Sequence, residues 1–524
     1  MAGHHKKKTD QPESEQSGLS RRALLKGALG SGLLTAAGAL LISSGAEAAV
    51  STREKAARWD EMWDIVVVGS GFAGLAAAAE AADRGAKVVV LEKMSGYGGN
   101  SVISHGEYAA WDDVYHLREK LGLGMDSAAL HEEDTLRGGN FYGHPELIRL
   151  LVKQAPSALK WLIDKGGAKI REKVLPSPGH SAPRIHTGIG GSGELFAAAL
   201  KKMAEQNGAT VRTNEKVTRI WRSSFSSPVT GVEVQRGEKR VNIAVRQARI
   251  LASGGFGRDL AMRQAYNPAM GPEYHSTNHS GATGEMIHLA RTIGADVTQM
   301  NFIQIYPFAD PVTGKFDVPS VFALRGPGSG MIYVDPAGRR FVNELADGNS
   351  CARAQIGVGG AQKLTYALFN QKMISRLGTQ DEVDAGLNAG RFARGETLAE
   401  LAQFLQMTPE VLTRTVSSHN RFIREGRDLE FGKENAAQMM PMEAGPFYAL
   451  PQWPAVHHTL GGLRINARAQ VVDIWGNSIP RLYAAGEVTG GIHGEKRLPG
   501  NSIPECLIFG RIAGTNAAEE KLPA

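Results

Sequence analysis

The sequence predicts an α/β protein built around a parallel β-sheet that is buried on both faces. Residues 64–93 read as a strand, a glycine turn, an alanine-rich helix and a second strand. Both strand segments are continuous β-branched runs, which is typical of strands covered on both faces. Two further apolar strands, in 248–259 and 479–491, also end in glycines. We therefore expect distant parts of the chain to join one sheet.

The first strand leads into a glycine turn of the type that binds phosphates. Gly69, Gly71 and Gly74 form G-x-G-x-x-G between a strand and a helix, and Glu92 follows the second strand. In this context the glycines permit a tight turn and a close approach to a pyrophosphate, whose charge the helix N-terminus favours. A carboxylate in the position of Glu92 accepts hydrogen bonds from ribose hydroxyls. The pattern predicts dinucleotide binding.

A second glycine cluster favours FAD over NAD. Residues 96–111 place another glycine group directly after Glu92, which suits a chain that wraps around a longer cofactor. The glycine-ended strands in 248–259 and 479–491 are expected to close the same site. We predict one FAD site assembled from three distant segments.

The composition limits the remaining classes of function. The chain has 524 residues, 42% hydrophobic and 21% charged, which is ordinary for a soluble protein of two or three domains. The net charge is +6 without a long basic run, so nucleic-acid binding is not expected. The two cysteines, Cys351 and Cys506, are expected to be free thiols. No haem, iron–sulfur or zinc spacing occurs, so no metal is predicted.

The first 48 residues have the pattern of an export signal. Arg21 and Arg22 precede an apolar run, and Ala46-Glu47-Ala48 fits a signal-peptidase site. The paired arginines predict a twin-arginine signal peptide over 1–48 and a periplasmic location. A membrane anchor is the alternative, but glycines and serines interrupt the apolar run, which is near the lower length limit for a span.

Several motifs together resemble one known family. They are "EKMSGYGGNS", "ASGGFGRD", "GRRFVNE", "HHTLGGL" and "GEVTGGIHGEKRLPGNS". The chain resembles the flavoproteins of the soluble periplasmic fumarate reductase and flavocytochrome c family, whose fold is shared with 3-ketosteroid dehydrogenases. The resemblance implies a doubly wound, Rossmann-type FAD-binding domain with an inserted α+β capping domain. The expected bounds are 49–290 and 436–524 for the FAD-binding domain and 291–435 for the cap.

The resemblance also implies a set of residues around noncovalent FAD. A histidine near His105 carries covalent FAD in membrane-bound relatives, but the family's position lies several residues earlier. The predicted cofactor-binding residues are Gly69, Gly71, Phe72, Ala73, Gly74, Glu92, Lys93, Gly99, Asn100, Ser101, Val217, Ala252, Gly254, Glu487, Asn501, Ser502 and Ile503.

Half of the family's substrate site is retained and half is altered. The family's carboxylate-binding histidine and arginine correspond to His458 and Arg497. A second carboxylate-binding histidine is replaced by Tyr306, and the proton-donating arginine by Gly348. The relay glutamate that precedes the retained Arg325 falls on Phe322, which leaves the proton donor open. The candidates for it are Arg325, Arg353, Asp347, His105 and Tyr306.

The resemblance implies an FAD-dependent reduction of the C=C bond of an α,β-unsaturated carboxylate, and the signal pattern implies that it takes place in the periplasm. Because Tyr306 is neutral and aromatic, an aryl- or imidazolyl-acrylate is expected rather than fumarate. A separate electron donor, such as a cytochrome c or a quinol-linked protein of anaerobic respiration, is also implied. Two alternatives stay open. They are a dehydrogenase of the 3-ketosteroid Δ1 type and a non-catalytic flavin electron carrier.

Overall fold

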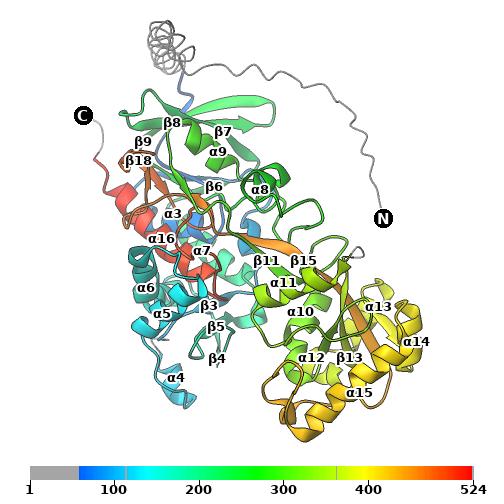
Figure 1. The fold of residues 1–524 in the computed structure, drawn as a ribbon. Coiled ribbons are helices and arrows are strands. Elements are labelled where there is room, and N and C mark those ends of the chain that lie inside the picture. The colour runs from blue at the N-terminus through cyan, green and yellow to red at the C-terminus, as the bar shows by residue number, and fades with distance from the viewer. Residues whose placement is uncertain (1–57, 113–114, 361–362, 522–524) are drawn as a thin grey trace, which may run out of the picture. The chain divides into compact units, whose positions relative to one another are not determined.

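The structure is a computed structural model that describes residues 58–112, 115–360 and 363–521 (Figure 1). The predicted signal peptide at 1–48 lies outside the described residues. Within the described ranges, no helix combines the length and the apolar character needed to cross a membrane. Both cysteines are free thiols, as expected.

The main sheet joins strands from both ends of the chain. Its strands run in the order β17-β18-β9-β1-β2-β6, and β8 pairs with β9 and β7 at one end. The bounds are β1 (Glu61–Val68), β2 (Val88–Leu91), β6 (Thr210–Arg212), β7 (Glu215–Arg222), β8 (Val229–Arg236), β9 (Lys239–Leu251), β17 (Gln470–Val472) and β18 (Ser478–Ala484). β1 pairs in parallel with β2 and β9, and β9 with β18. The expected common sheet is confirmed.

Two helices with small residues pack closely against each other beside this sheet. These are α3 (Phe72–Asp83) and α16 (Ser502–Ala518). A Cβ at Gly510 would lie 2.4 Å from the carbonyl oxygen of Ala73, and one at Gly514 would lie 2.3 Å from that of Ala77. Only glycine allows this approach, which brings the first turn of α16 close to the glycine turn that begins α3.

The remaining elements of this part surround the sheet. They are the strands β3 (Glu107–Ala109), β4 (Ile170–Leu175), β5 (Ile185–Gly188), β10 (Val297–Thr298) and β16 (Gly462–Leu463), and the helices α4 (Leu117–Lys120), α5 (Ala128–Gly138), α6 (Pro145–Asp164), α7 (Glu194–Gln206), α8 (Leu260–Tyr266) and α9 (Glu285–Thr292). β3, β5 and β4 form a separate antiparallel sheet. This small sheet carries the segment that follows the second glycine cluster.

A second hydrophobic core belongs to an α+β cap. Its antiparallel sheet contains β11 (Ile303–Ala309), β12 (Ile332–Val334), β13 (Thr365–Asn370), β14 (Ala393–Gly395) and β15 (Phe447–Thr459). Its helices are α10 (Val318–Arg325), α11 (Gly348–Val358), α12 (Ile374–Leu377), α13 (Gln380–Asn388), α14 (Leu398–Phe404) and α15 (Pro409–Glu425). The predicted α/β class with an inserted α+β part is confirmed. β15 pairs with the cap strands although it follows the expected boundary at 435.

Candidate active site

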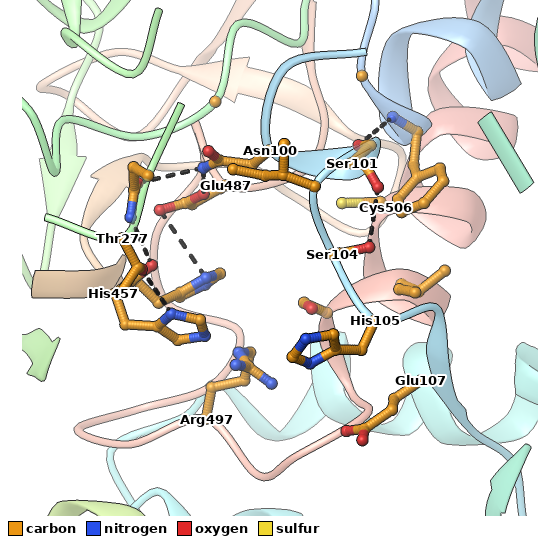
Figure 2. Close-up of a pocket in the computed structure, with 18 of the residues that line it drawn as sticks. Asn100, Ser101, Ser104, His105, Glu107, Thr277, His457, Glu487, Arg497 and Cys506 are labelled. Atoms are coloured by element: carbon orange, nitrogen blue, oxygen red, sulfur yellow. Dashed lines mark hydrogen bonds and ion pairs between the residues drawn. The ribbon is translucent and has the colours of Figure 1, made fainter. Parts of the chain in front are cut away.

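One cavity of about 990 Å³ is lined by residues of the part that contains the main sheet and by residues of the cap. All of the predicted cofactor-binding residues line it except Gly74 and Asn501. Figure 2 shows how side chains from distant segments, including Ser101, Glu487 and Arg497, surround this space. The three segments that were predicted to form the site therefore all line one cavity.

The first glycine turn is required by close backbone contacts. Gly69 has φ +104°, and a Cβ there would lie 2.4 Å from the carbonyl oxygen of Ala252 on the segment that follows β9. A Cβ at Gly74 would lie 2.0 Å from the carbonyl oxygen of Gly69. Gly74 thus lets α3 pack against the turn without lining the cavity, which is the packing role expected of the third glycine.

The start of α3 and the segment after β9 present backbone to the cavity without covering side chains. No side chain caps the helix at Gly71, and the first-turn N–H of Phe72 donates to Ser101 Oγ at 2.9 Å. Gly254 has φ +77°, and no atom lies within 4 Å of an added Cβ there. A helix N-terminus beside bare glycine backbone fits the pyrophosphate of FAD.

Glu92 lies at the end of β2 and organises the turn. Its carboxylate accepts hydrogen bonds from Ser70 Oγ at 2.6 Å and from the Met94 N–H at 2.9 Å. A carboxylate has about four acceptor positions, so capacity for a ribose hydroxyl remains. The neighbouring Lys93 Nζ lies 2.7 Å from Glu285, which ties the segment after β2 to α9.

Asn501 has a different place from the predicted one. It is fully buried, its Oδ1 lies 2.9 Å from His131 Nε2, and its Nδ2 donates to Thr135 Oγ1 at 3.0 Å. Both partners belong to α5, so the side chain is committed to that helix. Asn501 therefore anchors the loop that carries Arg497 and does not face the cavity.

Glu487 connects three segments beside Asn100 in the upper left part of Figure 2. Its Oε1 accepts the Thr459 N–H at 3.0 Å, and its Oε2 accepts from Asn100 Nδ2 at 3.3 Å. Burial raises the pKa of this carboxyl. His458 Nδ1 lies 3.8 Å away, so the cofactor side of the cavity adjoins the predicted substrate side.

Arg497 and His458 present polar groups to one end of the cavity. Arg497 Nη1 donates to the carbonyl oxygen of Leu498 at 2.8 Å, while its buried Nε has no hydrogen-bond partner among the described residues. Gln304 of the cap holds the backbone of Arg497, accepting its N–H at 3.3 Å. Burial and the charge of Arg497 keep the pKa of His458 well below its usual value. A guanidinium beside a neutral imidazole suits one carboxylate.

Aromatic rings form the cap side of the cavity. The ring of Tyr306 lies 5.4 Å from that of Phe308, 5.0 Å from that of Phe316 and 4.9 Å from that of His457. Phe316 in turn contacts the ring of His105 at 4.8 Å. Burial raises the pKa of Tyr306, so it is a neutral phenol, and burial lowers the pKa of His457 to about 3.

The positions expected to move a proton are altered. Gly348 is the first residue of α11, and a Cβ there would lie 3.8 Å from Tyr306 Cε2. Asp347 caps this helix, accepting the N–H groups of Asn349 and Ser350 at 3.1 Å. Phe322 is buried among the cap rings and does not line the cavity.

The two candidate arginines of the cap differ in position. Arg325 lines the cavity at the end of α10. Arg353 does not line it, and its exposed guanidinium pairs with Glu495 at 3.1 Å. The structure thus separates Arg353 from the other candidate catalytic residues, namely His458, Arg497, Arg325 and Tyr306.

Three polar residues of the cavity lining that bear on the chemistry were not predicted from the sequence. They are Glu107, Gln304 and His457. His457 Nδ1 lies 2.8 Å from Thr277 Oγ1. Successive residues of a strand point to opposite faces, and Tyr108 is fully buried on one face of β3. This alternation could have indicated that Glu107 faces the other way. The repeated histidine in "HHTLGGL" was a visible signal for His457.

Comparisons with known proteins agree with this geometry. Residues 64–503 match the family described as an FAD binding domain. The chain is 35% identical to the NADH:fumarate oxidoreductase of Klebsiella pneumoniae over 88% of its length, but it spans only 48% of that relative. It is 35% identical to the urocanate reductase of Eggerthella lenta, covering 83% of the chain and 71% of the relative. It is 31% identical to the acrylate reductase flavoprotein subunit of Shewanella woodyi, covering 92% and 94%.

Solved structures agree in fold. An open conformation of a flavocytochrome c3 fumarate reductase has a TM-score of 0.76 at 30% identity, covering 89% of this chain and 80% of that one. A 3-ketosteroid Δ1-dehydrogenase from Sterolibacterium denitrificans has a TM-score of 0.75 at 20% identity, covering 88% and 100%, and shows the same fold. The chain therefore belongs to the family of FAD-dependent oxidoreductases acting on C=C bonds that includes the fumarate, urocanate and acrylate reductases.

Proposed function

We propose that this protein reduces the C=C bond of an α,β-unsaturated monocarboxylate whose other end carries an aromatic group. The observation that supports it most is the pairing of Arg497 with an aromatic wall in one cavity. The guanidinium has a buried Nε without a partner among the described residues, and Tyr306 stands where the family has a carboxylate-binding histidine. An aryl- or imidazolyl-acrylate fits both ends, whereas the second carboxylate of fumarate meets Tyr306.

The aromatic wall offers a specific kind of contact. The rings of Tyr306, Phe308 and Phe316 already pack edge to face. A further ring in the cavity gains about 0.5–1.5 kcal/mol from such contacts beyond its buried area. The wall thus favours a flat aromatic substituent over a charged one.

The protein's residues hold the substrate and respond to its charge. Reduced FAD, when bound, supplies the hydride to the β carbon. Arg497 and His458 hold the carboxylate, where negative charge grows as the hydride arrives, and fixed positive charge stabilises that growth. Gln304 orients the Arg497 backbone from the cap and couples cap position to carboxylate binding.

The cellular setting forms part of the same proposal. The twin-arginine pattern at 1–48 supports export of the folded holoprotein to the periplasm. The chain has no haem-attachment motif, so electrons come from a separate donor, such as a cytochrome c or a quinol-linked protein of anaerobic respiration.

Anaerobic flavin reoxidation tests the reaction. The holoprotein is reduced with dithionite, and cinnamate, urocanate, acrylate or fumarate is added while flavin absorbance is followed. Rapid reoxidation by cinnamate or urocanate with slow reoxidation by fumarate is expected. Reoxidation by fumarate alone contradicts the aromatic preference, and no reoxidation by any enoate contradicts the reaction.

A steroid dehydrogenase is a second candidate, because Tyr306 is a neutral phenol in a large cavity and the fold is shared. It reverses the electron flow. Addition of a saturated 3-ketosteroid to the oxidised holoprotein would then bleach the flavin. A protein that responds to neither class of compound would be a non-catalytic flavin electron carrier.

A further inference from the structure

Glu107 is a cavity carboxyl that the retained family motifs do not include. It begins β3, and the next residue, Tyr108, is buried on the opposite face with its hydroxyl donating to the carbonyl oxygen of Ala155 at 2.8 Å. The N–H of Ala109 donates to the carbonyl oxygen of Gly500 at 2.9 Å. β3 therefore lies beside the loop of Arg497, and Glu107 lines the cavity there (Figure 2).

The carboxyl of Glu107 is half-buried in the cavity lining and unpaired. No hydrogen bond or ion pair joins it to any of the described residues, unlike Glu487 or Glu92. The charged and titratable groups that face it are Arg497, Arg325 and Tyr306. His105 lies two residues away in the same lining segment. Burial raises the pKa of Glu107, and the two arginines oppose the rise without cancelling it.

We propose that Glu107 is the proton donor of this site, an assignment that rests on the proposed enoate reduction. The hydride for the new C–H bond at the β carbon would come from bound FAD, which the external electron donor reduces. The π electron pair moves to the α carbon and takes the proton of Glu107 there. Glu107 is left as a carboxylate, which Arg325 stabilises and which regains its proton from water.

The other candidates fit this task less well. In the family a relay glutamate supplies protons to an arginine, and the position of that glutamate is Phe322 here, which disfavours Arg325 as the acid itself. The pKa of Tyr306 is raised and that of His105 is lowered, both by burial. Asp347 is held as a helix cap. Among the described residues that line the cavity, Glu107 alone combines an unpaired acidic group with nearby cations that stabilise its conjugate base.

Substrate binding should promote protonation of Glu107. A carboxylate bound at Arg497 offsets one of the two positive charges that face Glu107. Because those charges lower its pKa, offsetting one of them raises the pKa. The site therefore takes up part of a proton when a carboxylate binds, before any chemistry.

Proton uptake provides a test without turnover. The probe is 3-phenylpropanoate, the saturated counterpart of cinnamate, bound to the oxidised holoprotein. Calorimetry near neutral pH in buffers of different ionisation enthalpy measures the protons taken up, up to about one per site. Glu107→Gln should abolish the uptake while the probe still binds. The matched control is Glu172→Gln, at an exposed position of β4, which should keep it.

Single-turnover reoxidation tests the proton transfer. Dithionite-reduced holoprotein is mixed with cinnamate, in both water and D₂O. Glu107→Gln should slow reoxidation by about 10²–10⁴-fold, the usual contribution of a general acid, with little change in half-saturating cinnamate. Glu107→Asp should restore part of the rate.

Each result has a distinct meaning. An unchanged rate and unchanged proton uptake in Glu107→Gln overturn the assignment, while the proposed function stands if Arg497→Ala is inactive. A slow Glu107→Gln that still takes up the proton also overturns it, because the loss is then structural. If wild-type protein neither binds the probe nor reacts with any enoate, both the function and the assignment fail.

Discussion

The ring of Tyr306 lies 4.9 Å from the ring of His457 at an angle of 34°, so the altered family position is part of an aromatic cluster. Tyr306→Leu removes the face on which an aromatic substrate would pack. We expect half-saturating cinnamate to rise about two- to thirteenfold, since ring contacts of this kind contribute about 0.5–1.5 kcal/mol. Steady-state kinetics with cinnamate and acrylate checks this, and acrylate, which lacks a ring, should change less.

Tyr306→Phe is the control for the phenol group. It keeps the ring and removes only the hydroxyl, so cinnamate kinetics should stay within about twofold of wild type. A loss of 10² or more in turnover with unchanged FAD content would instead assign the proton to Tyr306 and contradict its role as a packing surface.

Arg497 should be indispensable for turnover but not for FAD binding. Arg497→Ala removes the cation that holds the carboxylate, and a fall of about 10²–10³ in kcat/KM is expected. Arg497→Lys should recover only part of this loss, because an ammonium lacks the planar fork. Flavin absorbance per protein should match wild type. Arg414→Ala, at an exposed position of α15, is the matched control for loss of an arginine.

Arg353 is close to Gly348 in sequence but does not line the cavity, so we expect no role for it in the reaction. Its contact is an exposed ion pair with Glu495, and such pairs contribute about 0–1 kcal/mol. Single-turnover reoxidation in Arg353→Ala is therefore expected within about threefold of wild type. A loss comparable to that of Arg497→Ala would mean that Arg353 reaches the substrate in a closed cap.

Local sequence patterns were sufficient for the sheet and for half of the site. The glycines at 69, 71 and 74 act within one turn, and their roles follow from backbone sterics alone. Arg497 and His458, which both line the cavity, were predicted because their motifs survive intact. These features depend on neighbours in sequence, so the sequence contains the information needed to predict them.

Other positions depend on contacts that no local pattern reveals. Arg353 was a candidate because it lies five residues after Gly348, but five helical residues turn roughly 140°, to another side of α11. Asn501 was assigned to the cofactor, whereas α5 uses its side chain. Glu107 faces the cavity because β3 pairs with the backbone of Gly500, a contact between opposite ends of the chain.

Acid should destabilise the protein through buried neutral histidines. Burial lowers the pKa of His131 from its usual value of 6.5 to about 3, so between these values the unfolded chain binds a proton that the folded chain does not. Stability is therefore lost as pH falls below about 6.5, by about 1.4 kcal/mol per pH unit for this group. Denaturant unfolding of wild type and His131→Gln at pH 5 and 7 measures it. The variant should lose less stability between the two pH values. An equal loss would show that His131 does not cause the destabilisation by acid.

Gly348→Arg should shift substrate preference toward dicarboxylates. The nearest atoms to a Cβ there are Pro307 Cδ at 3.5 Å and Tyr306 Cε2 at 3.8 Å, which are ordinary van der Waals contacts, and Gly348 has no positive φ, so a Cβ fits. A guanidinium beside Tyr306 offers a bidentate partner to a second carboxylate. We expect kcat/KM for fumarate to rise at least about tenfold, equivalent to roughly 1.4 kcal/mol, and that for cinnamate to fall. Gly348→Gln adds length without charge and should not raise fumarate turnover. If both variants favour fumarate equally, cavity shape rather than charge selects the substrate.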